Sequence, residues 1–265
     1  MDWSLSKMIR IENGEVGITP NDLKVLLDHY GVTEQRRIDP LVEMARASRG
    51  YSWADLRDFF SAADLMYFSF ESAASVIRTF QMALVPGLLQ TEEYARSILA
   101  NTYGYAGDDI DRRWQARQRR QELHERDVPP EMFFVLDEAV VRRRVGGDTI
   151  MRRQLEELKR WSEQPHVHLQ VLPFKAGAHK AMNGPLALLE FADPKDDDLL
   201  YQEHATGAAT SRDDPEVTAR YLELFYDLEA MALSPGYTLE LLDSLTDELG
   251  TAPKGSAKVK QEAAT

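Results

Sequence analysis

The best candidate for a binding site is the stretch of residues 173–185, PFKAGAHKAMNGP, between two predicted strands. It contains two glycines and is longer than an ordinary hairpin turn, and long connections of this kind are often functional. Its cationic and hydrogen-bonding side chains would suit a ligand or a partner protein: Lys175, His179, Lys180 and Asn183. The alternative is a structural Ω-type loop that only closes on itself.

Two further groups of side chains could do chemistry. His166 and His168 have the spacing that places two imidazoles on one face of a strand, but a zinc site needs a third ligand, such as His179, His204 or Glu203. The simpler interpretation is that the two histidines cover an exposed face of a sheet, so we predict no metal site. Arg78 lies in the middle of a predicted strand, where it would pair with a carboxylate such as Glu71 or Glu190, or meet an anionic ligand.

The sequence contains no recognisable catalytic motif. Phosphate-binding glycine loops, the G-x-S-x-G nucleophile turn and the H-E-x-x-H metalloprotease helix are all absent. We therefore predict no catalytic residues and no cofactor, and we favour a binding protein over an enzyme.

The composition is that of a soluble globular protein, with 43% hydrophobic and 28% charged residues among 265. The absence of cysteine excludes disulfides, and no apolar run is long enough to span a membrane, so we expect a cytoplasmic protein. The net charge of −13 argues against an overall nucleic-acid binder, because phosphate contacts come from Lys and Arg. A small DNA-reading module attached to an acidic body remains compatible with this charge.

The elements that would position these groups form an α+β body, with a mixed sheet covered by helices. Period-two alternation or short apolar runs predict strands, and period-3.6 patterns predict helices. The strands are expected at 76–81, 132–136, 166–172, 185–191 and 199–203; the helices follow Thr91 and span 109–126, 148–163, 214–232 and 236–249, with a short helix before Gly146. No periodicity remains after Gly250, which predicts a disordered tail at 250–265.

Two segments before and within the body have unusual compositions. Residues 50–70 are rich in aromatic side chains, which predicts a segment that docks on the body rather than a flexible linker. Residues 109–126 carry six arginines, a pattern typical of a solvated helix face, with a nucleic-acid or acidic-partner patch as the sharper alternative.

The N-terminal region is predicted to contain three helices, at 4–13, from Pro20 to Gly31, and from Thr33 to Arg49. Residues 4–32, SLSKMIRIENGEVGITPNDLKVLLDHYGV, resemble the second half of a Cro/repressor-type helix-turn-helix domain. The two helices that precede the recognition helix in that family are missing here. Either the start is assigned too far downstream, or the module is a degenerate remnant, and acidic residues outnumber basic ones within it.

A second resemblance covers the body. FESAASVIRTFQMALVPGLLQTEEYARSIL, LPFKAGAHKAMNGPLALLEF and ARYLELFYDLEAMALSP are similar to an uncharacterised, antitoxin-like C-terminal domain found behind helix-turn-helix modules in actinobacterial regulators. The two resemblances imply a partial helix-turn-helix module at 1–49 and a regulatory domain at 50–249.

Together these resemblances imply a transcriptional regulator. The module would read DNA through Ser4, Ser6, Lys7 and Arg10, and the body would sense a small molecule, bind a small partner protein or form a homodimer. The alternative is a helix-turn-helix-derived protein that has lost DNA binding and uses its body as a small-molecule-binding protein or pathway enzyme.

Overall fold

The computed structural model describes residues 3–12, 18–50, 53–56, 58–193, 196–204, 207–212 and 214–251. The predicted tail at 250–265 lies outside this range apart from its first two residues. No helix among the described residues is long and apolar enough to cross a membrane.

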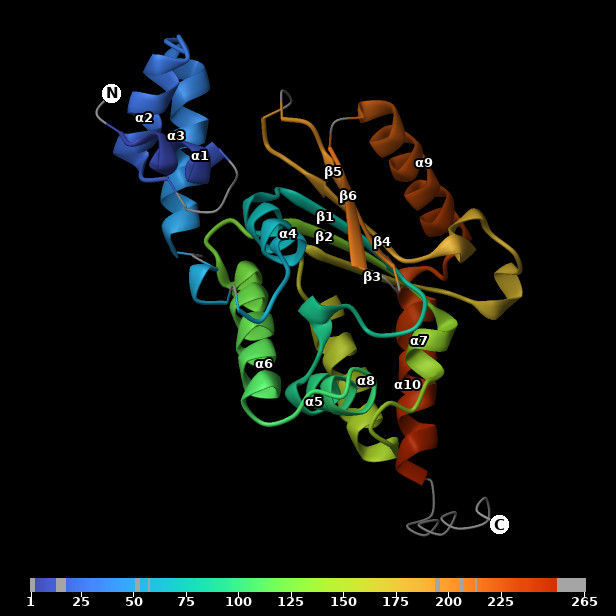
Figure 1. Cartoon of the computed structure of the whole chain (residues 1–265). Helices are drawn as coiled ribbons and strands as arrows, with labels where there is room; N and C mark the ends of the chain where they lie inside the picture. Colours follow the sequence, from blue (N-terminus) through green and yellow to red (C-terminus); the bar gives the residue numbers. More distant parts are fainter. Residues whose placement is uncertain are drawn as a thin grey trace.

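Three helices form the N-terminal region and stand apart from the body in Figure 1: α1 (Leu5–Glu12), α2 (Pro20–His29) and α3 (Gln35–Gly50). Side chains cap the first two of these helices. Ser4 Oγ accepts a hydrogen bond from the backbone N–H of Lys7, and Thr19 Oγ1 accepts one from Asp22 just before Pro20 opens α2. The loop between α1 and α2 lies largely outside the described residues.

The body is an α+β domain around one mixed six-stranded sheet, as predicted. The order across the sheet is β3-β2-β1-β4-β5-β6. Strand β1 pairs parallel with β2 and antiparallel with β4, so it lies where the parallel and antiparallel halves of the sheet meet. The strands are β1 (Val76–Gln81), β2 (Glu131–Asp137), β3 (Val167–Leu172), β4 (Leu186–Glu190), β5 (Leu199–His204) and β6 (Gly207–Ser211).

Helices cover the two faces of the sheet unequally (Figure 1). One face packs on several helices in a large apolar core, and we call it the multi-helix face. The opposite face carries a smaller core under a single helix, α9 (Pro215–Met231), and we call it the α9 face. The helices of the multi-helix face are α4 (Ala62–Ala73), α5 (Glu92–Asn101), α6 (Asp108–Gln121), α7 (Glu138–Arg142), α8 (Asp148–Ser162) and α10 (Pro235–Thr251).

Short 3₁₀ helices complete the chain: η1 (Ala54–Leu56), η2 (Gly87–Leu89), η3 (Glu122–Glu125), η4 (Phe174–Ala176) and η5 (Lys180–Asn183). Two elements were not predicted. Strand β6, GAATS, has small side chains and no apolar alternation, and α4 lies inside the aromatic-rich segment that we expected only to dock.

The aromatic-rich segment does dock on the body, and its partner is the arginine-rich helix α6. The guanidinium groups of Arg112, Arg113 and Arg119 lie over the rings of Phe59, Phe60 and Trp53, at 4.2, 4.8 and 5.2 Å from the ring centroids. Cation–π contacts of this kind stabilise both partners. The prediction that the arginines form a solvated face is therefore wrong for this side of α6.

Candidate functional site

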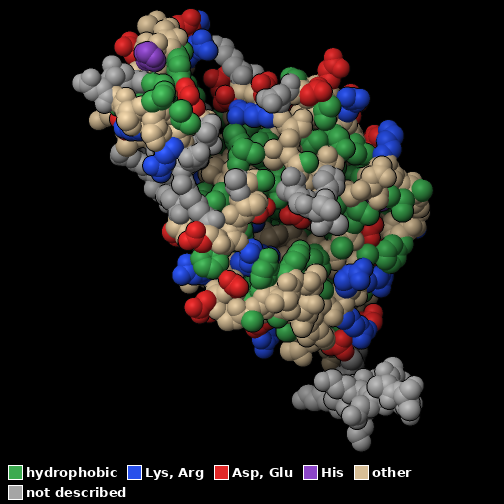
Figure 2. All heavy atoms as spheres, viewed as in Figure 1, with side chains coloured by type: hydrophobic (Ala, Val, Ile, Leu, Met, Phe, Trp, Pro, Cys, Tyr) green, Lys and Arg blue, Asp and Glu red, His purple; other side chains and the backbone are tan. Residues whose placement is uncertain are grey.

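A cavity of about 410 Å³ lies between the multi-helix face of the sheet and the helices that cover it. Figure 2 shows a hollow near the middle of this side of the molecule, with acidic and basic side chains in and beside it. The floor comes from alternate residues of β1, β2, β4 and β5, because side chains on one face of a strand recur at every second position. These floor residues are Thr79, Gln81, Phe134, Ala187, Tyr201 and Glu203.

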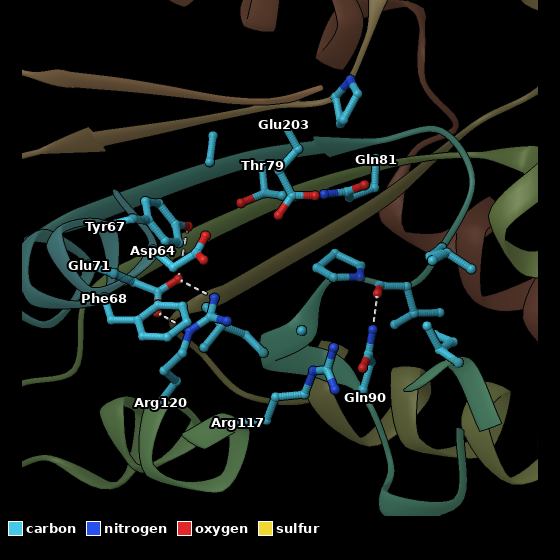
Figure 3. Close-up of a pocket in the computed structure, with 18 of the residues that line it drawn as sticks. Asp64, Tyr67, Phe68, Glu71, Thr79, Gln81, Gln90, Arg117, Arg120 and Glu203 are labelled. Carbon is cyan, nitrogen blue, oxygen red and sulfur yellow. Dashed lines mark hydrogen bonds and ion pairs between the residues drawn. The ribbon is translucent and has the colours of Figure 1, made fainter. Parts of the chain in front are cut away.

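The walls come from α4, α5, α6 and the segment that follows β1. Asp64, Tyr67, Phe68 and Glu71 project from α4, and Arg117 and Arg120 project from α6 (Figure 3). Arg113 of α6 also lines the cavity. The three arginines are spaced four and three residues apart, which places them on one side of a helix. Apolar wall is added by Leu84, Val85, Leu88, Ile98 and Leu99.

The segment after β1 is held rigidly against the helices by side-chain amides. Gln121 Nε2 donates to the carbonyls of Leu88 and Gln90 at 3.1 and 2.9 Å, and Gln154 Nε2 donates to that of Leu89 at 2.7 Å. Because these carbonyls are fixed from outside the cavity, the wall that they form is preorganised.

The most deeply buried charges of the cavity form a closed network on α4 and α6. Arg120 donates from Nε and Nη2 to the two carboxylate oxygens of Glu71, at 2.6 and 2.8 Å, and the Glu71 side chain is only 1% exposed. Burial alone would lower the pKa of Arg120, but the charge and hydrogen bonds of Glu71 outweigh it and raise that pKa. Tyr67 donates to Glu71 at 2.9 Å and stacks on Tyr201 with ring centroids 4.1 Å apart.

Other charged groups of the cavity lie outside this network: Arg113, which donates to the Phe59 carbonyl, and also Arg117 and Glu203. Arg117 Nη1 is buried without a hydrogen-bond partner, and burial lowers the pKa of Arg117 to about 10. Glu203 lines the cavity and is exposed to it, yet the neighbouring protein removes enough water to raise its pKa above the usual value of a glutamate. The attraction of Arg120 and Arg117 opposes that rise without cancelling it.

The residues predicted to bind a ligand or partner do not line this cavity. Arg78 lies on the α9 face, where its Nε donates to Glu190 Oε1 at 2.6 Å and its guanidinium lies 4.3 Å from the ring centroid of Phe133. Of the two outcomes expected for Arg78, the structure therefore contains the ion pair, with Glu190 rather than Glu71.

The predicted loop at 173–185 also belongs to the α9 side, apart from Pro185, which touches the cavity. His179 packs edge-to-face on Phe80 with ring centroids 5.6 Å apart, and Lys180 forms an ion pair with Asp227 of α9 at 3.1 Å. Lys175 and Asn183 are exposed. The loop thus folds onto the surface, and its role as a binding site stays a prediction.

The two histidines are not a pair on one strand face. His166 precedes β3 and is buried, whereas His168 is exposed on β3 and its Nε2 lies 3.1 Å from Glu131. Among the described residues, no group of three side chains could hold a metal ion.

The four predicted DNA-contacting residues lie on or next to α1. Ser4, Ser6 and Arg10 are exposed. Lys7 is held by the chain itself: its Nζ forms an ion pair with Asp22 at 3.2 Å and lies 4.2 Å from the ring centroid of Trp3.

Sequence reasoning missed the cavity residues. The spacing of Arg113, Arg117 and Arg120 was visible, but six arginines in one segment gave no sign of which would be paired. Glu203 was considered only as a third zinc ligand, and Glu71 only as a partner of Arg78.

Comparison with known proteins identifies the body of the chain. A family model described as a domain of unknown function (DUF5753) matches residues 66–244, which include the whole sheet and most of the cavity wall. The N-terminal helices lie outside the match, so their resemblance to a helix-turn-helix module stays a prediction. No curated protein and no solved structure matches the chain.

Proposed function

The chain belongs to the DUF5753 family, which is defined by a domain of unknown function. We propose that the body of the chain binds a small molecule and that the whole chain is a ligand-responsive regulator. The observation that carries this proposal is the cavity. Its volume of about 410 Å³ is in the range of ligand-binding sites, and its lining combines apolar side chains with a few convergent polar groups.

The route from the cavity to the N-terminal helices supports a sensing role. The aromatic-rich segment between α3 and β1 supplies one cavity wall through α4, and α6 supplies the next. Arg113 Nη2 donates to the Phe59 carbonyl at 2.7 Å, and Arg119 forms two hydrogen bonds of 3.1 Å with Asp55. A ligand that shifts α6 relative to α4 would therefore act on the segment that leads to α3.

In this proposal the N-terminal helices, similar to part of a Cro/repressor-type module, are the output. DNA would be contacted through Ser4, Ser6, Lys7 and Arg10, in a cytoplasmic protein. The second candidate is a protein that binds its ligand without reading DNA, as a stand-alone binding protein or pathway enzyme. The ion pair between Lys7 and Asp22 favours this alternative, because it occupies one of the four predicted contacts.

Ligand binding is tested with the full chain by thermal shift against a defined panel of amino acids, aliphatic and aromatic carboxylates, sugar phosphates and nucleotides. We expect at least one class to raise Tm, because a ligand that binds only the folded state stabilises it. The exposed Ala83 lines the cavity, so Ala83→Trp should fill the opening and abolish the shift. Ala192→Trp, at an exposed residue after β4, is the matched control and should respond like the wild type.

Two results would overturn ligand binding in the cavity: no panel member shifts Tm, or Ala83→Trp responds as the wild type does. A response that persists in Ala83→Trp but disappears when the loop residues Lys175 and Lys180 are replaced by Gln would place the site on the α9 side. A mass increase of the purified chain in light scattering, lost in Ala83→Trp, would instead indicate that a second copy covers the opening.

DNA reading is tested separately, by selection from a random duplex pool at low salt and titration of the enriched sequence. We expect binding that weakens as salt rises and that Arg10→Glu reduces about tenfold or more, since a lost cation and an added anion both act against phosphate contact. If no sequence is enriched at low salt, the second candidate function replaces the first.

A further inference from the structure

The cavity contains three arginines and three acidic residues, and most of these charges are already satisfied. Glu71 and Arg120 neutralise each other in the two-point pair described above. Asp64 caps α4 by accepting from the N–H of Ser61 and is hydrogen-bonded to Tyr201. Arg113 donates from Nη2 to the Phe59 carbonyl and lies 3.9 Å from the ring centroid of Tyr105, although its Nε is buried without a hydrogen-bond partner.

Arg117 is the third arginine of the cavity, and it differs from the other two. No hydrogen bond or salt bridge of Arg117 is found within the part of the chain that the structure describes, and its Nη1 is a buried orphan. Leaving a buried guanidinium without a partner costs free energy, and a protein recovers that cost when an anion binds.

Glu203 is the anion that remains, and it lies on the sheet across the cavity from Arg117 (Figure 3). Across the described ranges, no salt bridge of Glu203 is present. Thr79 and Gln81 of β1 belong to the same sheet floor and add hydrogen-bonding groups to the cavity (Figure 3). Among the described residues, the cavity therefore presents a cation without an ion-pair partner on its helical wall and a carboxyl group without one on its sheet floor, and apolar side chains also line it.

This inference rests on the proposed ligand-binding function and names the ligand class. We propose that the cavity binds a small zwitterionic amino-carboxylate, with its carboxylate on Arg117 and its ammonium group on Glu203. The carbon skeleton packs on Leu84, Leu88, Ile98 and Leu99. Binding then satisfies both unpaired groups at once, and a carboxylate matches the planar fork of the guanidinium.

The same charges disfavour a phosphate. A dianionic group needs more than one cation or a cluster of backbone N–H donors. Here Arg120 is already paired with Glu71, Arg113 donates to the Phe59 carbonyl, and the carboxyl group of Glu203 would repel a second negative charge. A neutral apolar ligand is also a poor fit, because it would leave Arg117 buried and unpaired.

The test measures affinities by isothermal titration calorimetry with the full chain. The probes are the twenty proteinogenic amino acids and a chain-length series of β-alanine, γ-aminobutyrate and 6-aminohexanoate. For each binder, the amide lacks the carboxylate, and the deaminated acid lacks the amine. We expect either change to weaken binding about tenfold to a hundredfold, the loss expected for one charge-assisted hydrogen bond.

Paired variants assign the two ends. Arg117→Gln should weaken binding of the zwitterion by a similar factor but leave the weaker binding of its amide unchanged. Glu203→Gln should weaken binding of the zwitterion but not that of the deaminated acid. The matched controls are Arg220→Gln and Glu223→Gln, both at exposed residues of α9, and both should bind as the wild type does.

The possible failures are distinct. If no amino-carboxylate binds but a phosphate or neutral compound binds in a manner that Ala83→Trp abolishes, the ligand class is wrong and the proposed function stands. If an amino-carboxylate binds equally well to Arg117→Gln, the assignment of its carboxylate is wrong. If no compound of either panel binds, both the ligand class and the proposed function are overturned.

Discussion

The two faces of the central sheet each bury an arginine close to acidic and aromatic side chains, and the candidate cavity lies on the multi-helix face. On the α9 face, Arg78 is paired with Glu190 and its guanidinium also lies 5.1 Å from the ring centroid of Tyr226. On the multi-helix face, Arg120 is paired with Glu71 through two hydrogen bonds, yet the neighbouring Arg117 has no ion-pair partner among the described residues.

The difference teaches where to look for a binding site. A buried charge with all its partners supports the fold, whereas a buried charge without one costs stability and is retained where a ligand supplies the missing partner. By this criterion the multi-helix face is the candidate site and the α9 face is structural. Four substitutions sharpen or break the comparison.

The largest effect is expected from Arg120→Met. It leaves the carboxylate of Glu71 buried and unpaired, and breaking one side of a buried ion pair costs about 3–5 kcal/mol. Urea denaturation monitored by circular dichroism measures the free energy of unfolding. The double variant Arg120→Met/Glu71→Met should recover most of the loss, because it removes both charges. A loss below about 1 kcal/mol in the single variant would mean that water or another group solvates Glu71.

Arg78→Met should give the next largest effect, a loss of about 1–3 kcal/mol in the same measurement. The loss is smaller because the Glu190 side chain is 25% exposed and keeps contact with water. Binding of any cavity ligand should be unchanged, since Arg78 lies on the other face of the sheet. A change in ligand affinity without a change in fold would contradict the separation of the two faces.

Unlike Arg120→Met and Arg78→Met, Arg117→Met should not lower the free energy of unfolding. Removing an unpaired buried cation and keeping apolar volume should leave the free energy of unfolding unchanged or raise it by up to about 1 kcal/mol. A destabilisation comparable to that of Arg120→Met would show that Arg117 already has a partner in the folded protein, and the comparison would fail.

The architecture was largely predictable from the sequence. Strands such as 76–81 and 166–172 alternate clearly, and Thr91 and Pro20 mark helix starts through local chemistry. Strand β6 was not predicted, because GAATS has neither large β-branched side chains nor apolar alternation. Its pairing with β5 depends on the tertiary structure. The docking of the aromatic-rich segment was predicted, but the arginines of α6 that it contacts were interpreted as solvent-facing. A run of aromatic residues and a run of arginines do not by themselves show that they contact each other.

The site was much less predictable, for a physical reason. The state of an arginine in α6 depends on whether an acid reaches it, and Glu71 lies 49 residues from Arg120 in the chain. The sequence gives the spacing of the arginines but not the distances that leave one of them unpaired. In the predicted loop at 173–185 the cations were easy to see in the sequence, yet Lys180 already forms an ion pair with Asp227 on the surface.

The smallest effect is expected from Glu203→Gln, and it depends on pH. Burial raises the pKa of Glu203 in the folded protein, so the folded state favours the protonated form more than the unfolded state does. The stability that this preference contributes is complete below the unfolded pKa and is lost as pH rises through the raised folded pKa. Glutamine resembles the protonated form at every pH.

At a pH below the ordinary pKa of a glutamate, Glu203→Gln should therefore unfold at the same temperature as the wild type. At neutral pH it should unfold at a slightly higher temperature than the wild type. Scanning calorimetry at a series of pH values measures the difference in Tm, with Glu223→Gln as the control that should show no such trend. A variant less stable than the wild type at neutral pH would mean that Glu203 gains more from Arg117 and Arg120 than it loses by burial. The cavity would then hold a balanced set of charges in the absence of ligand, and the contrast with the α9 face would disappear.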